Sequence, residues 1–280
     1  MSGHKGLIGK ELLKRLKSEG HDFVLGIDLR DKENPRDVRE INNLEISNEI
    51  KQKTDIFFHL AANCKVNKCI KEPEWAFENV EGVFQALEFC RKNNIKKFVY
   101  FSSSRVLYPE KNPYTASKLY GEELCKSYKK TYGIDYIIIR PSTVYGPGPD
   151  PTNRLMNIWL NKALNNENLE IYGNKDKTLD FTYVNDFVNG IMLAFNNSFQ
   201  NERENKEYNI ATGKGIKLYD VAKEIIKQTN ADSNIVLKEP EKQQPQQVET
   251  DISKIQKLGY KPKTDIKQGI KNCLDYFNKK

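Results

Sequence analysis

The chain has 280 residues, of which 38 % are hydrophobic and 30 % are charged, and its formal net charge is +7. This length is enough for one large α/β domain or for a two-lobed enzyme with a substantial core. No stretch approaches the roughly 18 consecutive apolar residues of a membrane span, and the N-terminus lacks the apolar core of a secretory signal. We therefore expect a cytoplasmic protein with no membrane partner.

The basic residues are spread along the whole chain rather than gathered on one element. Nucleic-acid binding would cluster them among aromatic side chains, so we expect no nucleic-acid partner. Five cysteines lie at positions 64, 69, 90, 125 and 273 without the paired spacing of a zinc site, and there are only three histidines. We interpret the cysteines as reduced and mostly buried thiols, and we expect no metal.

The first half of the chain alternates strand-like and helix-like segments. Short apolar runs typical of buried parallel strands occur at 23–27, 56–60, 98–101 and 136–139. Amphipathic patterns between them predict helices over 6–19, 75–92 and 114–132. The alternation predicts an α/β protein with a doubly wound parallel sheet of the Rossmann type.

The pattern changes after Tyr145, where Gly146, Pro147 and Gly148 predict a turn. Helical segments then alternate with short extended ones such as 169–172, and a last helix is predicted from about Ile266. We expect a cofactor-binding domain of residues 1–145 with a return segment at about 179–196. A smaller C-terminal α/β substrate lobe would comprise 146–178 and 197–280, and the ligand would bind between the two lobes.

Gly3, Gly6 and Gly9 open the first predicted helix with the spacing Gly-x-x-Gly-x-x-Gly. Such glycines permit a tight turn and a close approach to a pyrophosphate, which the helix N-terminus attracts. Asp28 follows the next predicted strand and can accept hydrogen bonds from ribose hydroxyls. Its charge would repel a 2′-phosphate and so favours NAD over NADP, a preference that Arg30 weakens. An ordinary helix start beside an unrelated surface Asp is the alternative.

A strand normally precedes this glycine loop, yet only Met1 and Ser2 precede Gly3. We therefore expect the first strand to be missing, either because the start is truncated or because the sheet is one strand short. A missing interior strand would leave unpaired backbone groups on its neighbours and weaken the floor of the cofactor site.

Tyr114 and Lys118 form a Tyr-x-x-x-Lys pattern, which places both side chains on one face of a helix. A tyrosine with a pKa near 10 is a poor base at neutral pH, but a nearby ammonium lowers that pKa. Ser102, Ser103 and Ser104 follow a predicted strand at its carboxyl end, where such folds place ligands. The combination predicts hydride chemistry, whereas each motif alone could be an exposed helix face or a turn.

Further motifs extend along the chain: His-Leu-Ala-Ala at 59–62, Asn-Val-Glu-Gly at 79–82, Arg-Pro-Ser-Thr-Val-Tyr-Gly-Pro-Gly at 140–148, Asp-Phe-Thr-Tyr-Val-Asn-Asp at 180–186 and Leu-Gly-Tyr-Lys-Pro at 258–262. With these motifs the sequence resembles, nearly end to end, the NAD-dependent nucleotide-sugar epimerase/dehydratase family of extended short-chain dehydrogenase/reductases. Its pattern is closest to UDP-glucose 4-epimerase-like members.

The resemblance implies NAD as cofactor, Tyr114 as base, Lys118 on the nicotinamide ribose and Ser104 on the reacting hydroxyl. Ser104 is chosen because it lies four residues before Tyr108, as in the family. The residues expected to contact the cofactor are Gly3, Gly6, Leu7, Ile8, Gly9, Asp28, Leu29, Arg30, Glu40, Ile41, Leu60, Ala61, Ala62, Asn79, Ser102, Tyr114, Lys118 and Pro141. Glu40 stands for the usual Asp at the adenine. Those expected to contact a nucleotide-sugar substrate are Lys65, Ser104, Thr143 and Arg154.

The chain departs from the family pattern beside the catalytic serine. Arg105 and Val106 follow Ser104, where members that dehydrate the sugar carry an Asp-Glu pair, so 4,6-dehydration is disfavoured. Only nine residues separate Ser104 from Tyr114, and this short loop is expected to reshape one wall of the sugar pocket.

Contacts to the diphosphate of the substrate are expected to be depleted. Thr143 replaces a usual Asn, Leu179 replaces a usual Arg, and residues 239–251 contain no arginine. Fewer bidentate donors weaken the anchor for a diphosphate. The cations that could substitute are Arg154, Lys162 and Lys177.

The expected function is epimerisation of a nucleotide sugar, at C4, by Tyr114-assisted hydride transfer. An NAD(P)H-dependent keto-sugar reductase and a non-catalytic dinucleotide- or sugar-binding protein are the alternatives. The resemblance also implies a homodimer in which helices 75–92 and 114–132 form a four-helix bundle. Phe77, Phe84 and Leu87 are compatible with that interface and equally with the core.

Overall fold

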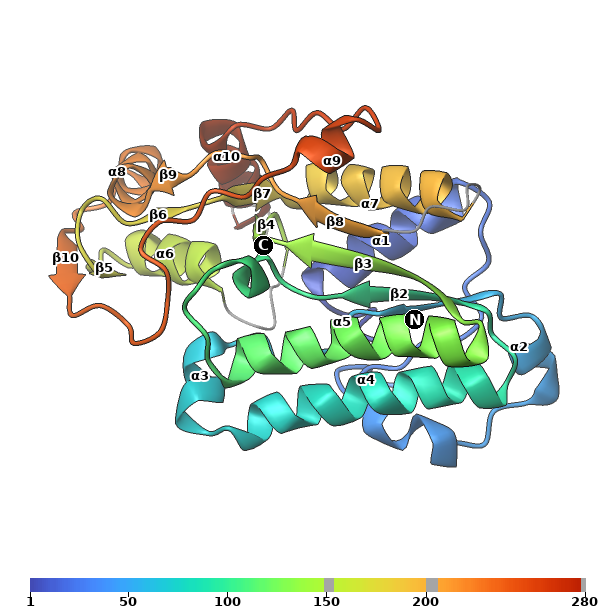
Figure 1. The fold of residues 1–280 in the computed structure, drawn as a ribbon. Helices are drawn as coiled ribbons and strands as arrows, with labels where there is room; N and C mark the ends of the chain where they lie inside the picture. Colours follow the sequence, from blue (N-terminus) through green and yellow to red (C-terminus); the bar gives the residue numbers. More distant parts are fainter. Residues whose placement is uncertain (149–153, 200–205, 278–280) are drawn as a thin grey trace.

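The computed structural model describes residues 1–148, 154–199 and 206–277. In this part of the chain the main sheet is parallel, with the strand order β1-β2-β3-β8. Its strands are β1 (Ile56–His59), β2 (Lys97–Phe101), β3 (Asp135–Pro141) and β8 (Glu207–Ile210). Helices lie on both faces of the sheet (Figure 1), so the predicted doubly wound α/β fold is confirmed.

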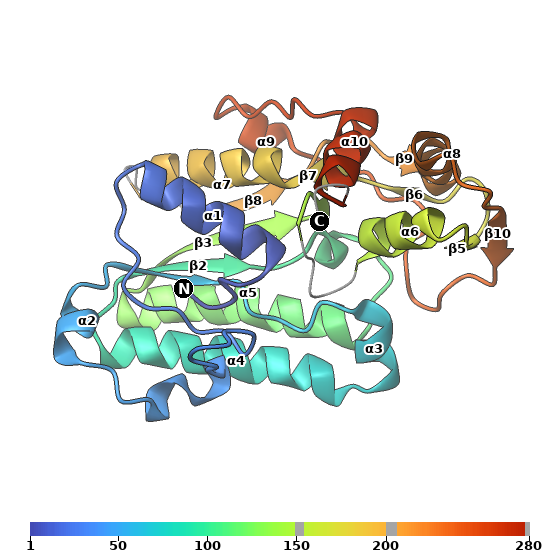
Figure 2. The same ribbon diagram turned by 180° about the vertical axis from the view of Figure 1, so that it is seen from behind.

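Two pairs of helices sandwich the sheet. One layer contains α4 (Glu74–Lys92) and α5 (Pro113–Tyr132), and the other contains α1 (Leu7–Ser18) and α7 (Val184–Ser198), as Figures 1 and 2 show. The helices predicted over 6–19, 75–92 and 114–132 are thus confirmed. Shorter elements connect these layers: η1 (Val38–Asn43), α2 (Asn48–Gln52), α3 (Val66–Lys71) and η2 (Ser104–Leu107).

The start of α5 is fixed by a capping box. The Asn112 side chain accepts a hydrogen bond from the Thr115 amide, and the Thr115 hydroxyl accepts one from the Asn112 amide. Pro113 occupies the first helical position, where its missing N–H is not needed. The helix therefore begins at a defined residue, one before Tyr114.

Residues 1–3 lie between β1 and the segment that contains Ile27. The Ser2 amide donates to the Phe58 carbonyl at 2.9 Å, and the Gly3 amide donates to the Ile27 carbonyl at 2.9 Å. The interior position of the expected first strand is therefore occupied over this short length. The run 23–27, which we predicted as a strand, forms only one bridge, at Ile27. That prediction was wrong because a strand requires a neighbour of matching length.

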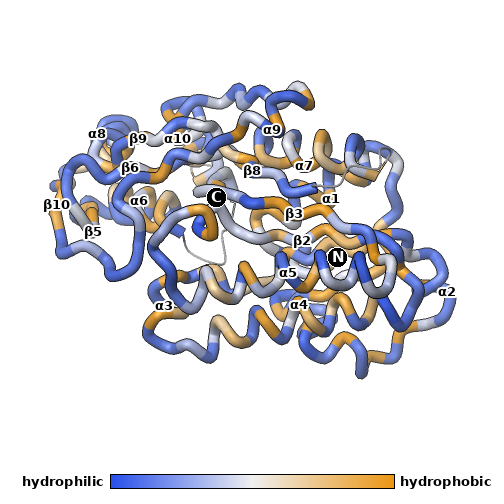
Figure 3. Tube along the Cα trace, in the orientation of Figure 1, coloured by the Kyte–Doolittle hydropathy of each residue, from blue (hydrophilic) through white to orange (hydrophobic). Residues whose placement is uncertain are grey.

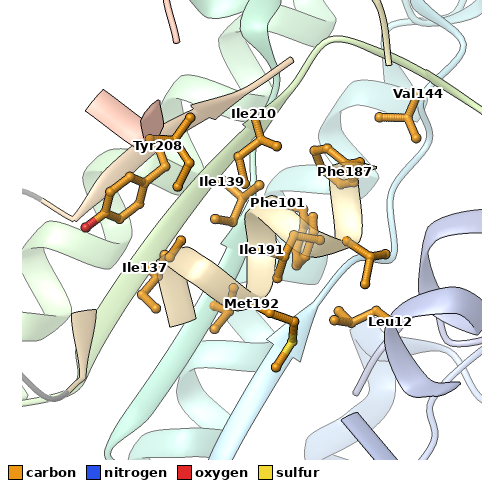
Figure 4. Close-up of a cluster of buried hydrophobic side chains, with 14 of the residues drawn as sticks. Leu12, Phe101, Ile137, Ile139, Val144, Phe187, Ile191, Met192, Tyr208 and Ile210 are labelled. Atoms are coloured by element: carbon orange, nitrogen blue, oxygen red, sulfur yellow. The ribbon is translucent and has the colours of Figure 1, made fainter. Parts of the chain in front are cut away.

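Apolar side chains cover both faces of the sheet. Toward α1 and α7, Leu12, Ile139 and Phe187 belong to one cluster (Figure 4), and toward α4 and α5 a second cluster contains Phe98 and Leu87. Hydrophobic residues accordingly concentrate along β2 and β3 (Figure 3). Burial of this surface is the main force that holds the helices on the sheet.

A smaller lobe packs beside the carboxyl ends of the strands. It contains α6 (Leu155–Leu164), α8 (Leu218–Thr229), α10 (Ile266–Phe277) and the pair β5 (Leu169–Tyr172) and β10 (Ile235–Lys238). Two further pairs connect it to the main sheet: β4 (Thr143–Tyr145) with β7 (Phe181–Tyr183), and β6 (Thr178–Leu179) with β9 (Ile216–Lys217). A third apolar cluster, around Trp159 and Leu169, forms the core of this lobe.

The boundary predicted at residue 197 has to be corrected. β8 pairs with β3 in the main sheet, and α9 (Ser253–Gln256) packs against β8. The backbone of β3 needs a hydrogen-bonding partner on its outer edge, and residues 207–210 supply it. These segments therefore belong to the larger domain, although they follow residue 197.

All five cysteines are free thiols and four of them are buried, as expected. Among the described residues, no helix has both the length and the apolar character that crossing a membrane requires.

Candidate functional site

A cavity of about 780 Å³ lies at the carboxyl ends of the strands, between the sheet and the smaller lobe. A second cavity, of about 220 Å³, adjoins it and shares Gly3, Arg30, Ala61 and Ala62 with it. Most of the residues predicted for the site line these cavities. The larger one is lined by Gly3, Gly6, Leu7, Ile8, Gly9, Arg30, Leu60, Ala61, Ala62, Lys65, Ser102, Tyr114, Lys118, Pro141, Thr143 and Arg154. The smaller one adds Asp28, Leu29 and Asn79.

The glycine loop is packed too closely for side chains. A Cβ on Gly9 would lie 2.2 Å from the Gly3 carbonyl oxygen, and one on Gly3 would lie 2.7 Å from the Ala61 amide nitrogen. Gly3 also has a φ of +74°, which disfavours other residues. Gly6 precedes α1 without a side-chain cap, so the amides of the first turn can bind an anion. This backbone cradle fits the pyrophosphate of a dinucleotide.

Asp28 is held firmly at the rim of the smaller cavity. Its two carboxylate oxygens accept hydrogen bonds from the Lys5 amide at 2.8 Å and the Arg30 amide at 2.9 Å. Each oxygen retains a second lone pair that can accept a hydrogen bond from a ribose hydroxyl. The position of Asp28 thus suits the predicted contact.

The smaller cavity is not lined by Glu40 or Ile41, contrary to the prediction. Glu40 is exposed, and Ile41 is buried in the core. Asp37 and Val38 line the cavity instead, because Asp37 caps η1 by accepting a hydrogen bond from the Arg39 amide. The signal that sequence reasoning missed is an Asp directly before a helical turn, the ordinary N-cap pattern.

Tyr114 and Lys118 meet on the wall of the larger cavity, one helical turn apart on α5. The Lys118 ammonium lies 6.0 Å from the centre of the Tyr114 ring. Burial lowers the pKa of Lys118 to about 8, so the ammonium is still mainly charged at neutral pH. Burial raises the pKa of Tyr114 well above its usual value, and the Ser103 hydroxyl and the Arg105 charge oppose this rise. Burial outweighs these two groups, so Ser103 and Arg105 only reduce the extent to which the site disfavours the phenolate.

The three serines at the end of β2 have different surroundings. Ser102 donates a hydrogen bond to Glu122 at 2.5 Å. Ser103 lines the larger cavity and is one of the groups that lower the pKa of Tyr114, whereas Ser104 is buried at the first position of η2 and lines neither cavity. The cavity that Tyr114 lines is thus also lined by Ser103, rather than by the predicted Ser104. The turn of η2 decides which hydroxyl reaches the cavity, and spacing in the sequence does not reveal that turn.

Among the candidate substitutes for the diphosphate anchor, Arg154 and Lys177 line the larger cavity together with Thr143 and Leu179. Lys162 does not line it and forms an ion pair with Glu170 at 3.1 Å. Sequence reasoning also missed the loop 239–247, from which Glu241 and Gln244 reach the cavity. Both contact Asn67 on α3, so this loop crosses the cavity rather than merely connecting elements.

Comparison with known proteins gives a consistent result. Residues 1–211 match the model of the family described as the NAD dependent epimerase/dehydratase family. A Methanocaldococcus jannaschii protein named putative UDP-glucose 4-epimerase is 29 % identical, and the alignment covers 99 % of this chain and 97 % of the relative.

Solved structures with the same fold are also similar over the whole chain. The Thermotoga maritima UDP-glucose 4-epimerase, solved with UDP-glucose, has a TM-score of 0.83 at 26 % identity, covering 99 % of this chain and 97 % of that structure. The Thermus thermophilus UDP-glucose 4-epimerase, solved with NAD, has a TM-score of 0.84 at 23 % identity, with 99 % and 97 % covered.

Proposed function

Because the chain belongs to the NAD-dependent epimerase/dehydratase family, we propose that it interconverts the C4 epimers of a nucleotide sugar. NAD is the cofactor. The glycine loop would hold its pyrophosphate and Asp28 its adenosine ribose, as their geometry allows. When bound there, NAD would supply the hydride acceptor that oxidation of the sugar carbon needs and, once reduced, the hydride donor for the reverse step.

Three side chains on the cavity wall would transfer the proton, stabilise charge and position the sugar. The Tyr114 phenolate takes the proton from the sugar hydroxyl and later gives it back, acting as base and then as acid. The Lys118 ammonium stabilises the phenolate by its charge. The Ser103 hydroxyl hydrogen-bonds the reacting oxygen and keeps it in line with Tyr114. The observation that supports this proposal most is that these three residues share one cavity with the glycine loop.

Dehydration of the sugar is disfavoured by the residues that follow the serines. Arg105 lines the cavity as a cation, and Val106 is buried. Neither side chain can donate and accept a proton as the acid and base of an elimination would.

The direct test incubates the purified protein with UDP-glucose and NAD and follows the sugar by chromatography. We expect UDP-galactose to form without net production of NADH, and the variant Tyr114→Phe to abolish the conversion. Net oxidation of NADH with a keto-sugar would instead identify a reductase. Ligand binding without turnover by the wild type would identify a binding protein, and loss of water from the sugar would identify a dehydratase.

We further propose that two copies associate through α4 and α5. Phe77 is 67 % exposed, Phe84 39 % and Tyr120 40 %, and all three lie on these helices. Large apolar side chains exposed together mark an interaction surface. Leu87 is fully buried in the core and belongs to the fold of one copy.

A further inference from the structure

Arg105 lies on the wall of the larger cavity, and no side chain in the described part of the chain forms an ion pair with it. Among the described residues, its guanidinium makes no hydrogen bond or ion pair, and its Nη1 atom is shielded from solvent. Burial lowers the pKa of this guanidinium, which shows that the surroundings disfavour its charge. A cation in such a position lowers stability unless an anion pairs with it.

The neighbouring charged groups do not supply that anion. Glu241 and Glu110 act on Arg105 from a distance, but among the described residues neither lies close enough to form an ion pair with it. Glu241 is 3.7 Å from the ammonium of Lys177, a second buried cation on the same wall. The positive charge of Arg105 lowers the pKa of Lys177, and both residues line the larger cavity. An anionic group between them would relieve this repulsion.

Arg105 is also close to the reacting centre. Its charge is one of the influences that lower the pKa of Tyr114. It follows Ser103 by two positions, and its amide donates a hydrogen bond to the Ser103 hydroxyl oxygen at 3.2 Å. Arg105 and Tyr114 therefore line the same cavity, and the charge of one acts on the other. Lys65 and Arg154 line the same cavity.

We propose that Arg105 binds a carboxylate on the sugar, so that the preferred substrates are nucleotide-linked uronic acids rather than neutral hexoses. This inference rests on the proposed epimerase function, whose substrate it specifies. A guanidinium binds a carboxylate through two parallel N–H···O hydrogen bonds. In a hexuronic acid the carboxylate is attached to C5, next to the reacting C4, which agrees with a cation placed beside Tyr114.

The experiment compares UDP-glucuronic acid with UDP-glucose as substrates of the wild type, Arg105→Met, Arg105→Lys and a control, Lys227→Met. Lys227 is exposed on α8 and lines neither cavity, so its substitution removes the same charge elsewhere. We expect the wild type to prefer UDP-glucuronic acid in kcat/KM. Arg105→Met should lose at least about 30-fold more in kcat/KM with UDP-glucuronic acid than with UDP-glucose, since only the acidic sugar loses a charge pair. A smaller loss common to both sugars is expected, because the charge of Arg105 also lowers the pKa of Tyr114. Arg105→Lys should retain part of the preference.

A thermal-shift measurement adds a readout that does not depend on turnover. Without ligand, Arg105→Met should have a Tm no lower than the wild type, because a partly buried cation with no ion pair among the described residues is removed. UDP-glucuronic acid should raise the Tm of the wild type more than UDP-glucose or UDP does, and this difference should disappear in Arg105→Met. If Arg105→Met fails to fold, the kcat/KM values and Tm shifts of Arg105→Lys are compared with those of the wild type instead.

Three results would overturn the proposal, and they are distinguishable from a failure of the proposed function. If Arg105→Met lowered the Tm shift caused by UDP as much as the shifts caused by the two nucleotide sugars, Arg105 would be assigned to the diphosphate. Interconversion of UDP-glucose and UDP-galactose without preference for the acidic pair would refute the inference and leave the epimerase function intact. If neither pair turns over, the epimerase function fails, and equal Tm shifts by the two sugars would refute recognition of the carboxylate as well.

Discussion

Lys118 donates a hydrogen bond from its ammonium to the backbone carbonyl of Phe101 at 3.0 Å. This bond joins α5 to the end of β2 and fixes the ammonium beside Tyr114. The position of the cation is thus set by the sheet, so the proposed reacting centre would be formed before a sugar binds.

The first prediction concerns pH. The pKa of Lys118 is lowered to about 8, so its ammonium loses a proton as the pH rises through that value. A neutral amine no longer stabilises the Tyr114 phenolate, and we expect kcat/KM to fall above about pH 8 with a slope of one proton. The measurement is a pH–rate profile at saturating NAD, with stability at each pH checked by fluorescence. A profile that stays flat through pH 9.5 in folded protein would contradict this role.

The second prediction separates the two serines. We expect Ser103→Ala to lower kcat about 10- to 100-fold, because it removes a hydrogen bond to the reacting oxygen. Ser104→Ala is the matched control, since this side chain is buried and lines neither cavity, and it should reduce kcat far less. Steady-state kinetics of both variants decide the question. The reverse order of effects would assign the role to Ser104, as spacing in the sequence suggested.

The third prediction concerns the choice of cofactor. Asp28 presents its carboxylate to the smaller cavity, and Arg30 lines the same cavity. Asp28→Ser removes the charge that would repel a 2′-phosphate and leaves the guanidinium of Arg30 to attract it. We expect the ratio of the Kd values for NADP and NAD to fall at least about 10-fold, a change of about 1.4 kcal/mol. Tryptophan fluorescence titrations with both cofactors measure it, and an unchanged ratio would mean that Asp28 does not contact the ribose.

The fourth prediction tests the association of two copies. Phe77→Asp and Phe84→Asp place charges on the exposed face of α4, and we expect each to shift a dimer toward monomer in light scattering. Leu237→Asp is the control, because Leu237 is 43 % exposed on β10 in the smaller lobe. A wild type that is monomeric at micromolar concentration would refute the association itself.

Much of the fold follows from local patterns in the sequence. The helices α1, α4 and α5 carry long amphipathic repeats, and β1, β2 and β3 are short apolar runs between them, so all six could be predicted. The run 23–27 has the same pattern but forms no strand, because pairing depends on a neighbour that local sequence does not describe. For the same reason the sequence did not predict that β8 belongs to the main sheet.

The sequence predicted which helices and turns form the site, but it did not always predict which residue of each one lines the cavity. Tyr114, Lys118 and the glycines line one cavity, as their spacing on a helix or a turn predicted, because that spacing fixes their geometry. The choices between Ser103 and Ser104, and between Asp37 and Glu40, depend on where a single helical turn begins. The absence of an ion pair for Arg105 among the described residues could not be predicted, because it depends on which side chains from distant segments the fold brings near it.

The capping residue Asn112 has a second role. Its side-chain amide donates a hydrogen bond to the carbonyl of Gln243, 3.0 Å away in the loop that crosses the cavity. The same side chain holds the first turn of α5, which carries Tyr114. The position of the loop and the start of the helix that carries Tyr114 are therefore joined through one side chain. A displacement of the loop away from α5 would break its bond to Asn112, and under the proposed function it would act on the residue that precedes the catalytic helix turn.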